Sequence, residues 1–305
     1  MTALAVYTTI YPGVERYLAD WSASLRRQTD RDFSLWIGLD VLDAETVQSA
    51  MGGDLDAVWV CSRDGDTPGS LRQRALAAVV EDHSAVLLVD SDDILHATRV
   101  ETARRGLRAH DLIACPLRLV DERGVSLEET FTLPPGVAAD AVFPRTNAFG
   151  LSNTAWRADL LRRCLPIPAE AMLVDWFLAT RAWLVGARLA FGERAEMDYR
   201  QYGANIARVR APFSERQVVE DTARVRAHYR LVRGSDLSGA DPARLATLEA
   251  AARDVELFSE RVVRRPATLT RYLRALNESR TTALWWAWVA DPSLRRFWTS
   301  EEGAT

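Results

Sequence analysis

Three aspartates follow an apolar run with little space between them. The stretch AVLLV (85–89) leads directly into Asp90, Asp92 and Asp93. Crowded carboxylates disfavour one another's ionised form, so a cation or abundant water is expected beside them. Closely spaced oxygen ligands suit a hard divalent ion, Mg²⁺ or Mn²⁺, and such an ion can bridge a diphosphate. The alternative is an exposed acidic turn, because aspartate and serine favour turns and helix starts.

A further carboxylate, Asp175, lies between Val174 and Trp176 at the start of a helical pattern. It could cap that helix by accepting backbone N–H groups. It could instead act as a general base, which must come within hydrogen-bonding distance of the proton that it removes. Apolar neighbours raise a carboxylate pKa, whereas a metal or an arginine lowers it. The residues alone leave both interpretations open, and Glu170 is the reserve candidate for the base.

Arginine supplies every strongly basic side chain, because the chain contains no lysine. Chemistry that depends on lysine, such as Schiff bases and Walker-type phosphate loops, is therefore excluded. Arg72 and Arg74 follow the turn at Gly69, and they could contact a diphosphate or lie on a solvated helix surface. Arg200 has a better claim, because it ends a predicted strand beside Tyr202.

Charge and cysteine content narrow the classes of partner. A formal net charge of −4 gives no general attraction to nucleic acid or anionic lipid. Cys61, Cys115 and Cys164 are widely spaced, and the histidines form no metal-binding pattern, so neither a disulfide framework nor a zinc knuckle is predicted. The chain shows no signal-peptide pattern and no apolar run of membrane-spanning length, so a cytoplasmic location is expected.

The elements that must position these residues alternate between strand and helix. Apolar β-branched runs predict strands, and apolar residues three and four apart predict helices. The alternation predicts an α/β, Rossmann-like fold whose mostly parallel central sheet is flanked by helices. Strands are expected at 4–10, 33–40, 56–61, 85–89 and 111–119, and helices at 14–28, 44–51, 71–80 and 98–108.

The candidate residues stand at the ends of these predicted strands. Ligands of open parallel sheets bind beyond the carboxyl ends of the strands. Thr8, Thr9, Asp40 and the cluster that begins at Asp90 all occupy such ends. We therefore expect them to share one site.

The pattern changes in the second half of the chain. A hairpin and a loop are predicted for 121–144, a strand for 147–156, a helix for 173–186 and short strands for 187–191 and 196–200. The remainder is arginine-rich and mostly helical in pattern. We expect residues 1–211 to form the catalytic domain and residues 212–305 to form a C-terminal helical extension. That extension would pack on this domain or on a partner subunit, which would make a homo-oligomer.

Four tryptophans lie close together near the C-terminus, in ALWWAWVADPSLRRFW (283–298). The preferred interpretation is a helix that packs its aromatic side chains onto the catalytic domain. The alternative is an anchor at the inner face of a membrane or a platform for a lipid-linked acceptor, because tryptophan is favourable at bilayer boundaries.

Three known motifs compete for the aspartate cluster. An EF-hand loop fails because Ile94 stands where another oxygen ligand is needed. A phosphatase of the haloacid-dehalogenase type also places D-x-D after a strand, but usually on its first strand. Glycosyltransferases that use nucleotide sugars carry their D-x-D near residue 90 of the domain, which is its position here.

With these residues in view, the chain resembles the family-2 glycosyltransferases of GT-A fold, over about residues 4–209. The motifs follow one another in the order of that family. They are the nucleotide-binding strand VYTTIYPG (6–13), SLRRQTDRDFSLWIGLD (24–40), GSLRQRALAAV (69–79), the D-x-D strand LLVDSDDILHATRVE (87–101), LPIPAEAMLVDWFLATRAWLVGARLAF (165–191) and the tail YRQYGANIARV (199–209).

The resemblance implies a role for each candidate residue. Donor binding is implied for Thr8, Asp40, Arg72, Asp90 and Arg200, metal binding for Asp92 and Asp93, and the catalytic base for Asp175. Of the two threonines, Thr8 is the one expected to hold the nucleoside. Two positions depart from the family pattern. Val174 replaces the glutamate that often precedes the catalytic aspartate, and Tyr202 stands where many members have a histidine. Asn205 in the same tail could bind substrate or shape a loop.

The expected function is therefore an inverting glycosyl transfer assisted by Mn²⁺ or Mg²⁺. The donor would be a nucleoside-diphosphate sugar, and the acceptor a hydroxyl of a carbohydrate, a lipid-linked molecule or another compound. Two alternatives stay open: a nucleotidyltransferase of related topology, and a degenerate member that binds a sugar or a partner without turnover. The residues do not identify the sugar, the nucleobase or the acceptor.

Overall fold

A computed structural model of the chain describes residues 3–53, 55–203, 211–279 and 284–299. Its first half alternates strands with helices, as the apolar spacing predicted. The elements are β1 (Leu4–Ile10), η1 (Glu15–Tyr17), α1 (Leu18–Arg26), β2 (Phe33–Leu39), α2 (Ala44–Ala50), β3 (Ala57–Cys61), α3 (Pro68–Asp82), β4 (Ala85–Leu88), β5 (Ile94–Leu95) and α4 (Arg99–Gly106).

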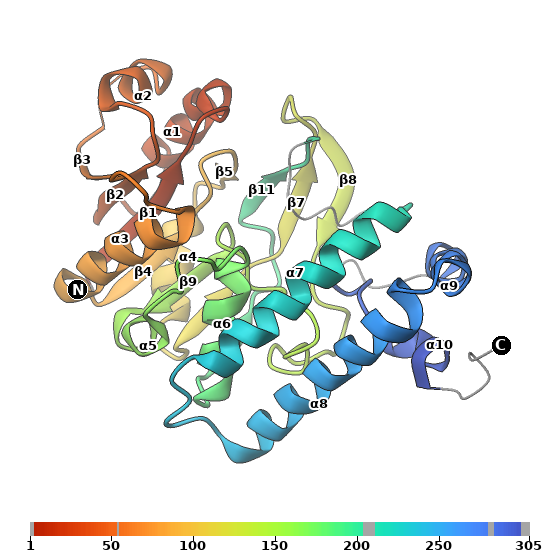
Figure 1. The fold of residues 1–305 in the computed structure, drawn as a ribbon. Helices are drawn as coiled ribbons and strands as arrows, with labels where there is room; N and C mark the ends of the chain where they lie inside the picture. Colours follow the sequence, from red (N-terminus) through yellow and green to blue (C-terminus); the bar gives the residue numbers. More distant parts are fainter. Residues whose placement is uncertain (1–2, 54, 204–210, 280–283, 300–305) are drawn as a thin grey trace.

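A seven-stranded sheet in the order β10-β6-β9-β4-β1-β2-β3 forms the centre of the molecule (Figure 1). Its strands run parallel except for β9 (Thr154–Arg157), which pairs antiparallel with β4 and with β6 (Leu112–Ala114). Every residue of β1 is buried, as expected for a central strand covered on both faces. The fold is therefore α/β with a mostly parallel sheet, and the carboxyl ends of β1, β2 and β4 share one edge.

The strand predicted for residues 111–119 is wrong as a single element. β6 ends at Ala114, and a second strand, β7 (Leu117–Val120), follows in a different sheet. Pro116 separates them, because a proline has no N–H for the β-ladder and is disfavoured inside a strand. The second sheet has the order β5-β11-β7-β8 and includes β8 (Ser126–Phe131) and β11 (Met197–Arg200). A hairpin is present as the antiparallel pair β7–β8, but its first strand lies before the range 121–144 in which the hairpin was predicted.

The helix predicted near residue 173 is confirmed as α6 (Val174–Leu184). Ten of its eleven residues are buried, with Asp175 as the exception, so α6 lies in the interior of the protein. The helix α5 (Ala158–Cys164) packs beside it, and β10 (Leu189–Phe191) joins the central sheet after it. Asp175 thus stands in the first turn of a helix that neighbouring elements hold in place.

Three long helices make up most of the C-terminal part. They are α7 (Glu215–Gly234), α8 (Pro242–Phe258) and α9 (Pro266–Glu278), with the π-helical turn η2 (Ser259–Val263) between the last two. Both α7 and α8 contact α6, which connects them to the N-terminal α/β part of the chain (Figure 1).

The tryptophan-rich segment does not form the single helix that was predicted for it. Its regular structure is limited to η3 (Pro292–Leu294) and α10 (Arg296–Thr299), and Trp286 has a positive φ of 70° that a helix does not allow. The expected packing of the aromatic rings is nevertheless present. Trp285, Trp286, Trp288 and Trp298 are all buried, at 4%, 3%, 1% and 0% exposure.

A membrane anchor built on these tryptophans is not supported, because their rings lie inside the protein. Within the described part of the chain, no helix has the length and hydropathy that crossing a bilayer would require.

Candidate active site

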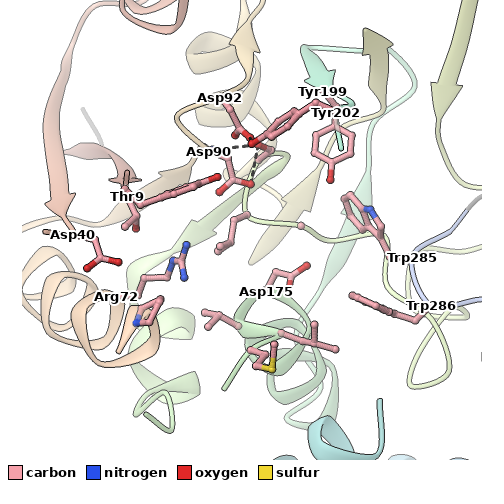
Figure 2. Close-up of a pocket in the computed structure, with 18 of the residues that line it drawn as sticks. Thr9, Asp40, Arg72, Asp90, Asp92, Asp175, Tyr199, Tyr202, Trp285 and Trp286 are labelled. Carbon is pink, nitrogen blue, oxygen red and sulfur yellow. Dashed lines mark hydrogen bonds between the residues drawn. The ribbon is translucent and has the colours of Figure 1, made fainter. Parts of the chain in front are cut away.

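A cavity of about 460 Å³ opens at the carboxyl ends of β1, β2 and β4 (Figure 2). Its other sides are formed by α3, the N-terminus of α6 and residues 284–299, called here the C-terminal segment. The cavity brings together most of the residues that the sequence singled out. Its lining includes Thr9, Tyr11, Asp40, Arg72, Asp90, Asp92, Ser152, Met172, Leu173, Asp175, Tyr199, Tyr202, Trp285 and Trp286.

Thr9, and not Thr8, faces the cavity from the end of β1. Side chains alternate between the two faces of a strand, so neighbours on β1 point in opposite directions. Thr8 is 1% exposed and is absent from the described lining of the cavity, whereas Thr9 belongs to it. The threonine at the end of β1 that a ligand in this cavity could contact is therefore Thr9, and the structure does not support the prediction of Thr8.

Arg72 brings the cavity a cation from the first turns of α3. The helix starts where Thr67 accepts a hydrogen bond from the backbone N–H of Ser70, with Pro68 in the first turn. Arg74, two residues further along α3, forms an ion pair with Asp66 at an N–O distance of 2.7 Å. No hydrogen bond or ion pair joins Arg72 to any described residue, so its guanidinium is available to an anion.

Asp90 and Asp92 are the members of the aspartate cluster that line the cavity. Burial raises the pKa of Asp90 to about 7, and the charge of Asp92 adds to the increase while Arg72 opposes it. Burial also raises the pKa of Asp92. The loop that carries them is tied to the sheet, because the hydroxyl of Ser91 donates to the carbonyl of Thr9 at 2.9 Å.

Asp93 points away from the cavity and is 1% exposed. One of its carboxylate oxygens accepts from the hydroxyl of Ser152, and the other accepts from the backbone N–H of Arg200 at 2.8 Å. Both oxygens are thus engaged in holding the loop, and its role as a metal ligand is not supported. Burial raises the pKa of Asp93 as well.

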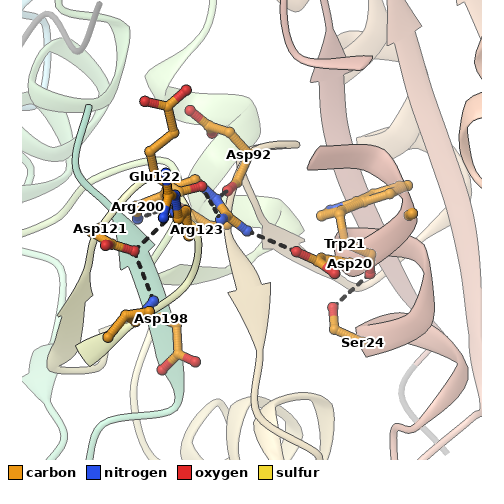
Figure 3. A network of polar contacts seen from close by, with 12 residues as sticks. Asp20, Trp21, Ser24, Asp92, Asp121, Glu122, Arg123, Asp198 and Arg200 are labelled. Atoms are coloured by element: carbon orange, nitrogen blue, oxygen red, sulfur yellow. Dashed lines mark hydrogen bonds and ion pairs between the residues drawn. The ribbon is translucent and has the colours of Figure 1, made fainter. Parts of the chain in front are cut away.

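Arg200 is not among the residues that line the cavity. Figure 3 shows it within a network of polar contacts beside Asp92, Glu122 and Asp20. The side chain is 1% exposed, and its guanidinium lies 4.5 Å from the ring centre of Tyr17. It donates to the carbonyl of Asp92 at 2.9 Å and to that of Glu122 at 2.7 Å, and it pairs with Asp20 at 3.2 Å. The expected contact with the donor is therefore not supported: these bonds hold the loop that carries the aspartates.

Tyr202, which stands where the family often has histidine, donates its hydroxyl to Asp92 Oδ2 at 2.7 Å. Burial and the adjacent Asp92 raise the pKa of the phenol above its ordinary value, so it stays protonated and acts as a donor. Tyr202 thereby orients a carboxylate and does not replace a metal ligand. Asn205 lies outside the described residues.

The described residues hold no group of three or more histidine, cysteine, aspartate or glutamate side chains arranged to bind a metal ion. The cavity offers the two carboxylates of Asp90 and Asp92 as hard oxygen donors.

Asp175 faces the same cavity from α6, opposite the strand ends (Figure 2). Burial raises its pKa to about 6. Backbone N–H groups in the first turn of the helix, Arg72 and the side chain of Asn147 all act in the opposite direction. The amide of Asn147 donates to Asp175 Oδ2 at 2.8 Å. The result is a carboxylate that is held in place and ionised at neutral pH, as a general base must be. Glu170, the reserve candidate, is exposed and outside the described lining.

Sequence reasoning missed several residues of the site. Asn147 and Ser152 carry no local signal, because each acts on an aspartate that is distant in the sequence. Trp285 and Trp286 were interpreted as core residues, with a membrane anchor or a platform for a lipid-linked acceptor as the alternative, and both line the cavity. The adjacent tryptophans were a usable signal for a binding surface, but nothing in the sequence connected them with Asp175.

The sequence matches no protein-family model and no curated protein. Solved structures do match. Residues 1–349 of TarS from S. aureus in complex with UDP-GlcNAc give a TM-score of 0.59 at 18% identity, over 90% of this chain and 79% of that chain. A longer TarS chain gives 0.56 at 20% identity, over 84% of this chain and 44% of that one. The mannosyltransferase PcManGT from Pyrobaculum calidifontis, in complex with GDP-Man and Mn²⁺, gives a TM-score of 0.52 at 14% identity, over 98% of this chain and 88% of that chain.

These neighbours are GT-A glycosyltransferases, and the likeness extends over most of the chain. Identities this low establish the architecture and leave the chemistry to the residues of the cavity. The protein has the GT-A fold, as its ordered motifs predicted.

Proposed function

We propose that the protein is an inverting glycosyltransferase that uses a nucleoside-diphosphate sugar and Asp175 as its base. One observation carries the proposal: Asp175, Arg72, Asp90 and Asp92 line a single cavity in a GT-A fold. A base, a cation for a diphosphate and a pair of hard oxygen ligands are the groups that this reaction needs.

The donor occupies the side of the cavity formed by the strand ends. Thr9 and Asp40 contact the nucleoside, and Arg72 forms hydrogen bonds with the diphosphate. A guanidinium binds phosphate oxygens in bidentate fashion, and such charge-assisted bonds are stronger than neutral ones. Support comes from Arg72 itself, which lines the cavity and forms no hydrogen bond or ion pair with a described residue.

Asp90 and Asp92 fit a divalent ion, either Mn²⁺ or Mg²⁺, together with phosphate and water oxygens. Both carboxylates are buried enough to have raised pKa values, and each lies beside another negative charge. A divalent cation would offset that repulsion, and hard oxygen donors are the ligands that both ions prefer. When bound, such an ion supplies charge stabilisation to the departing diphosphate.

Asp175 takes the proton of the acceptor hydroxyl as the oxygen attacks the anomeric carbon. The new bond forms on the face opposite the diphosphate, the bond to the diphosphate breaks, and one displacement inverts the carbon. The proton ends on Asp175, and the electron pair of the broken bond leaves with the diphosphate. Residues 1–211 carry this chemistry, and residues 212–305 cover the acceptor side.

A comparison of two variants tests the proposal. Asp175→Asn should bind the donor as the wild type does and lose transfer by about 10²–10⁴-fold, the usual contribution of a general base. Asp92→Ala should lose metal-dependent binding of the nucleoside diphosphate. The assay is a panel of UDP and GDP sugars with and without Mn²⁺, read as sugar transfer and as donor hydrolysis.

Glu170→Gln is the matched control, because this exposed carboxylate lies on the chain segment just before α6. It should keep the wild-type rate. Transfer by Asp175→Asn at the wild-type rate would show that the base is misassigned. Release of pyrophosphate from a nucleoside triphosphate and a sugar phosphate would instead identify a nucleotidyltransferase.

A further inference from the structure

Part of the cavity lining is apolar. Trp285 and Trp286 lie on the side of Asp175 that faces away from Arg72 (Figure 2), and Met172 and Leu173, just before Asp175 in the chain, add apolar surface to the lining. The tryptophans come from the C-terminal segment, more than a hundred residues beyond Asp175 in the sequence. A hydroxyl that reaches Asp175 from this side must belong to a molecule that tolerates an apolar surface.

The C-terminal segment is held firmly in this position. Its backbone pairs with that of Asn147, with N···O distances of 3.1 and 3.2 Å between Asn147 and Trp285. The ring of Trp285 packs on Phe131, with centroids 4.1 Å apart, and Trp286 stacks on Trp176 at 6.4 Å. Asn147 also donates to Asp175, so one residue fixes both the wall and the base.

The charged side chains that line the cavity are mostly negative. Of the described side chains that line it, Asp40, Asp90, Asp92 and Asp175 are carboxylates, and Arg72 is the only arginine. The donor diphosphate adds further negative charge and takes Arg72 as its partner. No cation in the described lining is left for an acidic group on the acceptor, and like charges brought together without a counter-ion oppose binding.

We propose that the acceptor is an uncharged glycoside whose ring lies against the wall of Leu173, Trp285 and Trp286. This inference rests on the proposed function and names its acceptor class. A pyranose ring combines an apolar face of C–H groups with a polar edge of hydroxyls. The cavity matches both, because Trp285 and Trp286 lie beside the carboxylate of Asp175 in the same lining (Figure 2).

A matched pair of acceptors tests the charge argument. p-Nitrophenyl β-glucoside and p-nitrophenyl β-glucuronide differ in one carboxylate, so their ratio of kcat/KM isolates the effect of charge. With whichever UDP or GDP sugar the wild type hydrolyses, the glucoside should be favoured by about tenfold or more. Equal rates for the two acceptors would overturn the proposal, as would hydrolysis of the donor without transfer to any neutral glycoside.

Met172→Arg supplies the missing cation at a position that tolerates change, because Met172 is 61% exposed. The variant should reduce the preference for the glucoside about two- to fivefold, the size expected for an exposed ion pair. Met172→Gln, a neutral variant at the same site, should leave the ratio unchanged. An unchanged ratio in Met172→Arg would count against the charge argument.

Trp286→Phe tests the wall separately. It should raise the KM of the glucoside and leave the KM of the donor unchanged. An unaltered acceptor KM would remove Trp286 from the acceptor site. A wild-type protein that neither hydrolyses nor transfers any sugar would refute the proposed function itself, which distinguishes that failure from a wrong acceptor class.

Discussion

At the scale of single residues, the carboxylate of Asp175, the proposed base, has a pKa set by opposing effects. Burial opposes ionisation and raises its pKa to about 6, while the helix N–H groups and Asn147 favour the carboxylate. The balance leaves Asp175 ionised at neutral pH but more basic than an exposed aspartate. A base is most useful when its pKa lies near the working pH, because it is then both ionised and able to hold a proton.

The rate of transfer should therefore follow the ionisation of Asp175. Below a pH of about 6 the kcat/KM for the acceptor should fall about tenfold per pH unit, and above it the rate should level off. Rates measured from pH 5 to 8 test this. Donor affinity over the same range serves as the control, since a parallel loss of binding would assign the pH dependence to the donor site.

At the scale of elements, a glycine lets the C-terminal segment approach the loop before β9. A Cβ atom on Gly150 would lie 2.6 Å from Cη2 and 2.9 Å from Cζ3 of Trp285, too close for real atoms. The ring of Trp285 cannot move aside easily, because the ring of Phe131 packs on it and the ring of Tyr199 lies edge-on to it, with ring centres 5.9 Å apart. The close packing of the loop before β9 against the C-terminal segment therefore depends on Gly150 having no side chain.

Gly150→Ala should destabilise the protein by about 1–3 kcal/mol, the cost of overpacking, and should weaken acceptor transfer. Gly234→Ala is the control, since a Cβ there meets nothing within 4 Å. Thermal unfolding and acceptor kinetics provide the measurements. Adding Trp285→Phe to Gly150→Ala should recover part of the lost stability. A Gly150→Ala variant as stable as the control would refute the packing argument.

At the scale of the whole molecule, the fold gathers carboxylates that oppose one another before any ligand binds. The folded protein raises the pKa of Asp90 from 3.8 to about 7 and that of Asp175 from 3.8 to about 6. Groups with raised pKa values bind protons more tightly when folded. Their contribution to stability is therefore complete below pH 4 and is lost as the pH rises through 6 and 7.

Asp90→Asn should raise the unfolding temperature of the ligand-free protein at pH 8, because the variant buries no charge at this position. Each kcal/mol added to the free energy of unfolding raises the unfolding temperature by about 2–4 °C in a protein of about this size. The gain should shrink toward pH 5, where the wild-type carboxyl is protonated. Asp64→Asn, at an exposed position, should change little. A gain that does not depend on pH would contradict the electrostatic explanation.

The sequence alone was enough to predict the α/β alternation, the strand-end positions of Asp40 and Asp90, and the helix that begins beside Asp175. These features follow from local rules, since the spacing of apolar residues sets the element and the element sets its own ends. Local rules also misplaced some residues. They could not show that Pro116 separates strands of two sheets, or that the chain from residue 284 lacks a long helix.

The order of elements, the GT-A fold and the edge of the sheet that carries the site were thus determined by the sequence. Only the tertiary structure decided which neighbours face the cavity: Thr9 instead of Thr8, Asp92 instead of Asp93. It also turned Arg200 from a ligand contact into an internal support and brought Trp285 beside Asp175 through Asn147. The physical reason is that orientation and partnership depend on contacts between residues far apart in the chain, and no local pattern encodes them.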